Sequence, residues 1–143
     1  MLIICSSERA EHMGKIRVLL ADDHETVLAR VRGLLCEDFD VVGAVNNGRD
    51  AVEEAERLDP DVLIIDISMP ILNGLQAAHH LKAKNRRAKI IFLTVYNDQE
   101  FVAAALSAGA SGYVTKSDIT TDLVPAIREV LQGRRYISQS IPP

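Results

Sequence analysis

Four short runs with strand-like composition are each followed by side chains that could do chemistry. Asp22 and Asp23 follow the run 18–21, Asp66 follows 62–65, Thr94 follows 90–93, and Lys116 follows 112–115. In an open parallel sheet the carboxyl ends of the strands share one edge, and ligands bind there. Three carboxylates, a hydroxyl and an ammonium would therefore meet in one place. That set suits a magnesium ion and a phosphoryl group.

Each of these residues has an ordinary role when it is taken alone. An aspartate before a helix is a common N-cap, a threonine at a strand end is a typical strand residue, and a lysine in a loop is usually solvated. The combination is more specific, because three carboxylates at one edge repel one another unless a cation neutralises them. Hard oxygen ligands favour Mg²⁺. An attack by Asp66 on phosphorus would give an aspartyl phosphate, which Mg²⁺, Lys116 and Thr94 could stabilise together.

From residue 16 onward, β-branched runs alternate with helical patterns, which is typical of a parallel sheet with helical crossovers. The sequence predicts strands at about 16–21, 40–45, 61–66, 89–94 and 111–115, and helices at about 25–36, 48–58, 73–84, 98–108 and 120–132. The expected helix starts are Asn47, Asn73, Asn97-Asp98 and Thr120-Thr121. The second and fifth strands are the expected edges. The pattern favours a doubly wound α/β fold with a five-stranded parallel sheet and five helices.

Composition limits the class of protein. The chain has 143 residues with 48% hydrophobic content, enough for one buried core. We expect residues 1–14 to be a disordered extension, 15–138 one domain, and 139–143 the start of a linker or a C-terminal tail. The net charge of −4 argues against a general nucleic-acid-binding surface. Cys5 and Cys36 lack metal-ligand spacing, and without a secretory or membrane signature we expect reduced thiols in a cytoplasmic protein.

The strings around these residues resemble the receiver domain of response regulators in two-component signalling. They are Asp22-Asp23, then Asp66-Ile67-Ser68-Met69-Pro70 with Asn73-Gly74, then Thr94, and then Gly109-Ala110-Ser111-Gly112-Tyr113-Val114-Thr115-Lys116-Ser117. The resemblance covers 16–138, and the order, spacing and strand placement all agree. The string 109–113 and the ending 133–138 further resemble the NarL/FixJ (LuxR-type) class, which normally precedes a helix-turn-helix DNA-binding domain. The fold implied is the flavodoxin-like receiver topology.

The resemblance implies a role for each site residue. Asp66 would accept a phosphoryl group from a phosphohistidine on a sensor histidine kinase. Asp23, Asp66 and the Ser68 backbone carbonyl would bind Mg²⁺ directly, with Asp22 acting through water. Lys116 would contact the phosphoryl group. Thr94 would move to bond it, which opens space for Tyr113 to rotate.

The resemblance also marks Ser68 and Tyr96 as positions that tune the lifetime of the phosphoaspartate, and an aromatic ring at Tyr96 could hinder attacking water. Such a protein is a regulator with self-phosphorylation and autodephosphorylation chemistry, not an ordinary enzyme. We expect a phosphorylation-dependent homodimer and no membrane partner. DNA would be contacted only through a helix-turn-helix domain absent from this chain, and the output would be transcription.

Other functions are less well supported. A phosphatase with an aspartyl nucleophile wants a second aspartate two residues later, where this chain has Ser68, which cannot transfer that proton at neutral pH. A flavodoxin-like nucleotide-binding module would need a phosphate loop that is missing. A receiver-like domain that is never phosphorylated is disfavoured because all the chemical positions are intact. A stand-alone receiver that acts by binding other proteins is the alternative within the family.

Overall fold

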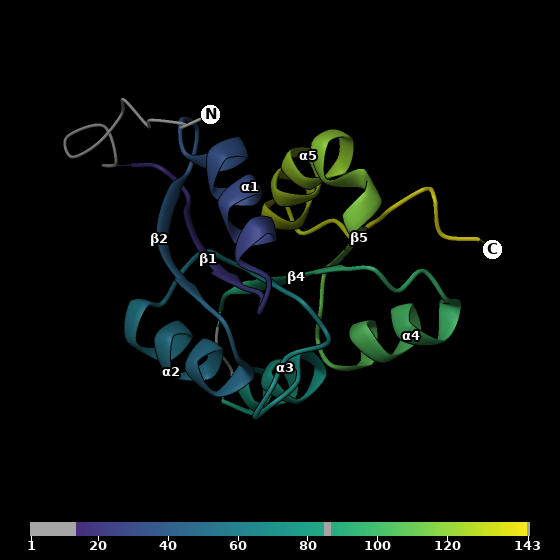
Figure 1. Cartoon of the computed structure of the whole chain (residues 1–143), viewed down its shortest axis with the longest axis horizontal. Helices are drawn as coiled ribbons and strands as arrows, with labels where there is room; N and C mark the ends of the chain where they lie inside the picture. The colour runs from purple at the N-terminus through teal and green to yellow at the C-terminus, as the bar shows by residue number, and fades with distance from the viewer. Residues whose placement is uncertain (1–13, 85–86, 143) are drawn as a thin grey trace.

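The structure is a computed structural model that describes residues 14–84 and 87–142. Strands and helices alternate along the chain (Figure 1). In order they are β1 (Arg17–Ala21), α1 (Glu25–Leu35), β2 (Asp40–Val45), α2 (Gly48–Leu58), β3 (Val62–Ile65), α3 (Gly74–Ala83), β4 (Lys89–Thr94), α4 (Gln99–Ser107), β5 (Gly112–Thr115), a 3₁₀ turn (Lys116–Asp118), α5 (Ile119–Leu131) and β6 (Tyr136–Ile137). The extension predicted at 1–14 lies outside the described residues, except for Gly14.

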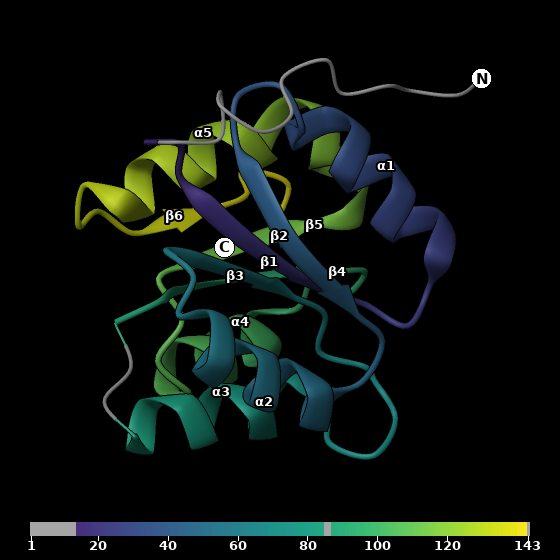
Figure 2. The same cartoon turned by 90° about the vertical axis from the view of Figure 1, so that its left-hand side faces the viewer.

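The strands form one parallel sheet in the order β2-β1-β3-β4-β5-β6. Helices α1 and α5 cover one face of the sheet, and α2, α3 and α4 cover the other (Figure 2). This is the doubly wound α/β arrangement that the sequence predicted. The order of the strands changes direction between β1 and β3, and in such sheets that position forms a crevice for ligands.

The sheet has six strands rather than the predicted five. The sixth, β6, pairs with β5, where Gly112 lies opposite Tyr136 and Tyr113 lies opposite Ile137. The edges are therefore β2 and β6, and the prediction that the fifth strand is an edge is wrong. A strand of two residues is too short to show the alternation by which strands are recognised. Gly133, with a φ of 82°, follows α5 in the left-handed conformation typical of helix ends.

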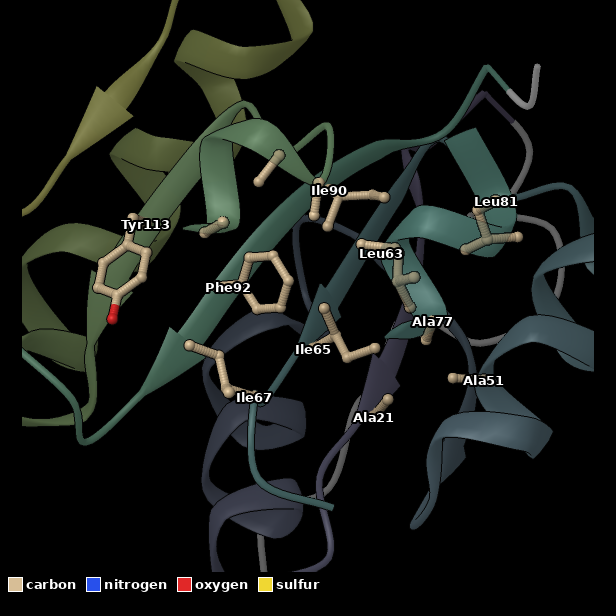
Figure 3. Close-up of a cluster of buried hydrophobic side chains, with 14 of the residues drawn as sticks. Ala21, Ala51, Leu63, Ile65, Ile67, Ala77, Leu81, Ile90, Phe92 and Tyr113 are labelled. Atoms are coloured by element: carbon tan, nitrogen blue, oxygen red, sulfur yellow. The ribbon is translucent and has the colours of Figure 1, made fainter. Parts of the chain in front are cut away.

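Both faces of the sheet are buried, as the apolar runs predicted. Leu63, Ile65 and Phe92 belong to the core beneath α2, α3 and α4 (Figure 3). Ile64 and Ile91 point to the opposite face and pack in the core beneath α1 and α5. Two apolar layers thus hold the central strands from both sides and fix the positions of their carboxyl ends.

Two of the predicted helix caps are formed and two are not. The side chains of Asn47 and Asn73 accept hydrogen bonds from backbone N–H groups in the first turns of α2 and α3. Asp98 precedes α4 without a side-chain cap hydrogen bond. Helix α5 begins at Ile119, so the predicted start at Thr120-Thr121 lies inside it. The cause is the 3₁₀ turn, which leads directly into α5 and sets its first residue.

Gly74, the first residue of α3, packs against the backbone of Asp66. A Cβ atom at Gly74 would lie 2.0 Å from the Asp66 carbonyl oxygen, so only glycine allows this approach. The Gly74 N–H also donates to the Ile67 carbonyl at 2.8 Å. The start of α3 therefore fixes the backbone at the end of β3.

The expectations for the cysteines and for membrane segments have different outcomes. Cys36 is disulfide-bonded, so the predicted reduced thiol is wrong for this residue, because composition does not reveal which side chains approach one another. Within 14–84 and 87–142, no helix is both long and apolar enough to cross a membrane.

A first prediction concerns Ile71, in the loop between β3 and α3. Its φ is 71° and it is 67% exposed. The left-handed conformation costs a non-glycine residue roughly 1–2 kcal/mol. We expect Ile71→Gly to raise the free energy of unfolding by about 0.5–1 kcal/mol, because the relief of strain exceeds the entropic cost of glycine. Urea unfolding followed by circular dichroism measures the change. Ile71→Ala keeps the strain and is the control, and a less stable glycine variant would contradict the argument.

Candidate functional site

The carboxyl ends of β1, β3, β4 and β5 meet at one edge of the sheet, as predicted. Ala21 lies opposite Ile65, so the aspartates that follow β1 and β3 are adjacent. The Asp66 N–H donates to the Ala21 carbonyl at 3.0 Å, which ties the two strand ends together. Thr94 lies opposite Thr115 at the ends of β4 and β5. The topology therefore brings together side chains that are far apart in the sequence.

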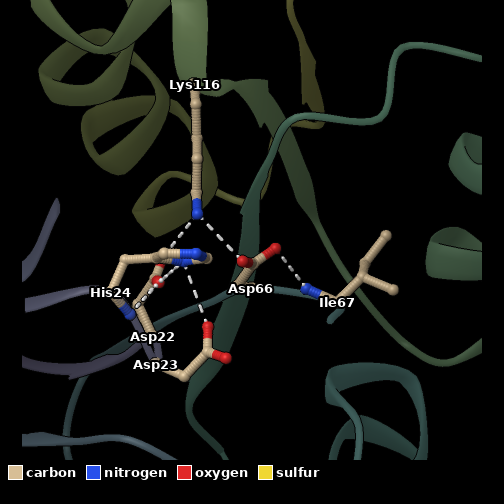
Figure 4. Close-up of polar contacts among 6 residues, drawn as sticks. All are labelled: Asp22, Asp23, His24, Asp66, Ile67 and Lys116. Atoms are coloured by element: carbon tan, nitrogen blue, oxygen red, sulfur yellow. Dashed lines mark hydrogen bonds and ion pairs between the residues drawn. The ribbon is translucent and has the colours of Figure 1, made fainter. Parts of the chain in front are cut away.

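Asp66 lies at the centre of the site and is 3% exposed. Its Oδ1 accepts a hydrogen bond from the Ile67 N–H at 2.7 Å, and its Oδ2 accepts one from Lys116 Nζ at 2.9 Å (Figure 4). Burial of a carboxylate is costly unless hydrogen bonds and an opposite charge compensate for it. Both oxygens of Asp66 have such a partner, which fixes the orientation of the carboxylate.

The ammonium of Lys116 is shared by two carboxylates. Its Nζ lies 2.9 Å from Asp66 Oδ2 and 2.9 Å from Asp22 Oδ2. The contact with Asp22 is an ion pair without hydrogen-bond geometry. Burial alone would lower the pKa of Lys116, but its close contacts with the carboxylates of Asp22 and Asp66 outweigh burial, and the pKa is raised. Lys116 therefore carries its charge at neutral pH.

His24 belongs to the same cluster, although sequence reasoning did not include it. Its Nδ1 lies 3.1 Å from Asp22 Oδ1 and 3.1 Å from Asp23 Oδ1. One ligand atom from each of Asp22, Asp23, His24 and Asp66 lies within 4.8 Å of the others. A signal was available, because His24 directly follows the two aspartates. It precedes α1 without forming a side-chain cap, and its ring faces the carboxylates instead (Figure 4).

The donor set fits a hard divalent cation. Asp22 and Asp66 are 4% and 3% exposed, and the ammonium of Lys116 contacts both. Asp23 is on the outer side of the cluster and is exposed. A cation among these carboxylates would relieve their repulsion, and carboxylate oxygens with room for water suit Mg²⁺. Ser68, whose carbonyl is expected to be a further ligand, lies exposed in the loop that follows Asp66.

Thr94 is fully buried, and its Oγ1 has no hydrogen-bond partner among the residues that the structure describes. An unpaired buried hydroxyl costs roughly 1–3 kcal/mol. Thr94 ends β4, the strand next to the one that leads into Asp66. An anionic oxygen bound at this edge of the sheet would give the hydroxyl an acceptor.

Tyr113, the residue expected to rotate, is fully buried in the structure. Its hydroxyl donates to the backbone carbonyl of Tyr96 at 2.8 Å, and burial raises its pKa, so the phenol keeps its proton. The ring of Tyr96 stacks on Phe101 with centroids 4.2 Å apart. The loop after Thr94 is thus joined to β5 through Tyr113 and to α4 through Phe101.

Comparison with known proteins identifies the family to which this site corresponds. Residues 18–128 match the family described as the response regulator receiver domain. The chain belongs to this family. The resemblance based on the acidic residues, Thr94 and Lys116 is thereby confirmed. Receiver domains bind Mg²⁺ at an acidic pocket, and the cluster of Asp22, Asp23, His24 and Asp66 in this chain could hold a metal ion.

Named relatives support the predicted class of receiver domain. GacA of Pseudomonas viridiflava is 38% identical over 128 residues, and the nitrate/nitrite response regulator protein NarL of Escherichia coli (strain K12) is 36% identical over 128 residues. Both alignments cover 88% of this chain, but only 60% of GacA and 59% of NarL. The chain therefore spans about three fifths of the length of these relatives.

A solved structure gives the same result for the fold. A two-component response regulator of the LuxR family from Aurantimonas sp. SI85-9A1 superposes on this receiver domain with a TM-score of 0.84 and 33% identity. The superposition covers 90% of this chain and 93% of that one. The flavodoxin-like receiver fold is therefore shared with a LuxR-family regulator.

A second prediction follows from the shared ammonium. Lys116→Met leaves Asp22 and Asp66 facing each other without a counter-charge. We expect the free energy of unfolding at neutral pH to fall by about 3–5 kcal/mol, the usual cost of leaving a buried charge unpaired. Mg²⁺ should restore more stability in the variant than in the unmodified chain, because the cation then supplies the missing charge. Urea unfolding with and without Mg²⁺ measures both effects.

Lys82→Met is the matched control for this experiment. Lys82 is exposed and its Nζ donates to the Ser107 carbonyl at 3.3 Å, away from the acidic cluster. Its replacement should change stability by less than about 0.5 kcal/mol and should leave the response to Mg²⁺ unaltered. Equal losses in the two variants would show that the buried carboxylates do not need the charge of Lys116.

Proposed function

We propose that this chain is a phosphorylation-activated receiver that takes a phosphoryl group from a sensor histidine kinase onto Asp66. The reaction depends on Mg²⁺, and its product changes the surface that controls an output. One observation carries the proposal: Lys116 contacts Asp66 Oδ2 and Asp22 Oδ2 at 2.9 Å each, inside a site where both carboxylates are buried. The arrangement holds a nucleophilic carboxylate beside a cationic group that can bind a phosphoryl oxygen.

Each residue has a defined part in the proposed transfer. An oxygen of Asp66 attacks phosphorus, and a bond between them forms while the bond from phosphorus to the donor imidazole nitrogen breaks. The ammonium of Lys116 moves from the Asp66 carboxylate to the phosphoryl oxygens, which carry the negative charge after the transfer. The unpaired hydroxyl of Thr94 donates to another of these oxygens, which removes the cost of its burial.

Asp22, Asp23, Asp66 and the carbonyl of Ser68 would hold the metal, with Asp22 acting through water. When bound, Mg²⁺ neutralises negative charge on the carboxylates and on the transferred group. His24 contacts both Asp22 and Asp23, so it orients the two carboxylates that the cation would approach.

The switch is proposed to run through Thr94 and Tyr113. A shift of Thr94 toward the phosphoryl group moves the following loop, whose Tyr96 carbonyl accepts the hydrogen bond of Tyr113. The stack of Tyr96 on Phe101 carries the same shift to α4. Ser68 and Tyr96 are proposed to tune the lifetime of the phosphoaspartate, through the access of water to Asp66.

The proposed output is transcription, through a DNA-binding domain separate from this receiver. The likeness to GacA, NarL and a LuxR-family regulator supports it, as does the length of GacA and NarL beyond the shared region. The kinase partner implies a cytoplasmic protein. The receiver could instead act alone by binding other proteins. An aspartyl-nucleophile phosphatase is less well supported, because Ser68 stands where that chemistry wants an aspartate.

The test of this function is phosphorylation by acetyl phosphate, which supplies a phosphoryl group without a kinase. We expect intact-mass spectrometry to show one added phosphate, only when Mg²⁺ is present. The added mass should vanish in Asp66→Ala and persist in the matched control Asp61→Ala, an aspartate at the opposite end of β3 that binds the Arg17 N–H. Labelling of Asp66→Ala to the same extent would overturn the assignment.

A further prediction concerns self-association, since phosphorylation is proposed to produce a dimer. Sedimentation velocity should show a larger mean mass when Mg²⁺ and beryllofluoride, a mimic of aspartyl phosphate, are added together. We expect the dimer dissociation constant to fall by about five-fold or more, the lower range of allosteric coupling. Asp66→Asn should abolish the response. An unchanged mass with the mimic bound would remove dimerisation from the proposal.

A further inference from the structure

Residues 136–142, called the tail strap here, run from β5 and α5 to α4 (Figure 1). The strap begins with β6, which pairs with β5. Near its end, Ile141 is 8% exposed and packs in the same core as Tyr113 and Val102. The side chain of Gln99, at the start of α4, donates to the carbonyl of Pro142. The strap therefore covers the outer edge of β5 and links the helices on its two sides.

Two serine hydroxyls fasten the strap to α5 and to the turn before it. Ser138 Oγ donates to Asp122 Oδ2 at 3.0 Å, and Ser140 Oγ donates to Asp118 Oδ2 at 2.6 Å. Ser138 is 2% exposed, and its N–H donates to the Tyr113 carbonyl at 2.9 Å. These contacts are specific in direction, because a hydrogen bond weakens steeply with misalignment.

Thr115, the last residue of β5, belongs to the same hydrogen-bond network and directly precedes Lys116. Its Oγ1 donates to Asp118 Oδ2 at 2.9 Å and lies 3.1 Å from Ser140 Oγ, and its N–H donates to Ser138 Oγ at 3.2 Å. Thr115 is 3% exposed, so water cannot easily replace these partners. Asp118 thus accepts hydrogen bonds from β5 and from the strap at one carboxylate oxygen.

The residue that begins the 3₁₀ turn and the residue that ends it have different partners. Lys116 begins the turn and contacts Asp66 and Asp22, whereas Asp118 ends it and holds the strap. Lys116 and Asp118 are two residues apart in one turn, so a backbone displacement at one of them is passed along the chain to the other. The phospho-acceptor and the strap are therefore joined by one short element.

We propose that this turn couples the occupation of Asp66 to release of the tail strap. The inference rests on the proposed function and deepens it. A phosphoryl group on Asp66 places the anionic oxygens that Lys116 binds further from the β3 backbone. When Lys116 follows them the turn shifts, and Asp118 no longer meets Ser140 and Thr115 in hydrogen-bond geometry. Release exposes the edge of β5 and the apolar site in which Ile141 packs. The surface between α4 and α5 changes as a result.

Hydrogen exchange of the full chain tests the coupling, with Mg²⁺ and beryllofluoride as the probe. The reporters are the amides of Ser138 and Ile141, which donate to the carbonyls of Tyr113 and Ser138. We expect both amides to exchange about five-fold faster or more when the mimic is bound. Amides within β3 should keep their protection, which distinguishes release of the strap from general unfolding.

Ser140→Ala provides the reciprocal measurement. Loss of this hydroxyl should loosen the strap without the mimic, so the reporter amides exchange several-fold faster. Because coupling between two sites is reciprocal, the variant should also bind beryllofluoride more tightly by a similar factor. Thr120→Ala is the matched control: its hydroxyl accepts a hydrogen bond from Arg30 on α1, on the side of α5 away from the strap, and both readouts should stay unchanged.

The possible results distinguish failure of the proposed phosphorylation at Asp66 from failure of the proposed coupling to the tail strap. Fluorine NMR reports bound beryllofluoride directly, and Asp66→Asn should lose that signal. Absence of binding to the unmodified chain would overturn the proposed function and the coupling with it. Bound mimic with unchanged or slower exchange in the strap would overturn the coupling alone. Faster exchange in Ser140→Ala with unchanged affinity for beryllofluoride would also overturn the coupling alone.

Discussion

The shared ammonium of Lys116 is the constraint on which the site depends. Parallel pairing of β1 with β3 forces Asp22 and Asp66 side by side, and both carboxylates are buried. Like charges so close repel each other, and an opposite charge between them relieves the repulsion. Lys116 comes from the end of β5, which lies beyond β4 from β3, so the whole central sheet must form before the charges are balanced. A buried ion pair of this kind adds little net stability, which favours a functional reason for its presence.

The two apolar layers supply the stabilisation that holds this arrangement in place. Phe92 and Ile91, neighbours on β4, belong to opposite layers, so the central strand is fixed from both sides. Two residues at the carboxyl edge of the sheet have unfavourable local features. Thr94 has a buried hydroxyl without a partner among the described residues, and Ile71 has a left-handed backbone. Departures of this kind gather at functional sites, where the rest of the fold compensates for them.

The sequence predicted the parts of the structure that repeat a local pattern. Strands such as Val62–Ile65 are continuous apolar runs, and the polar residues at their ends were sufficient to indicate the site. It did not reveal His24 as a member of the cluster, because the direction of its ring depends on Asp22 and Asp23 and not on spacing. The sequence did not predict the sixth strand, because two residues are too few to show a periodic pattern. The pairing of β6 also depends on a tertiary feature, the return of the chain to β5 after α5. The start of α5 was misplaced for a similar reason, since the preceding turn is set by tertiary contacts of Lys116 and Asp118.

The short strand β6 has a consequence for solubility. An uncovered strand offers unpaired backbone groups to other chains and is a site of edge-to-edge aggregation. In this protein β5 contributes four residues to the sheet, whereas β6 contributes two. The sheet therefore presents a shorter free edge on this side than β5 would. Arg134 and Arg135, both exposed, stand immediately before β6 and place positive charge beside that edge. The segment that follows the last helix thus protects the chain from uncontrolled pairing with its own copies.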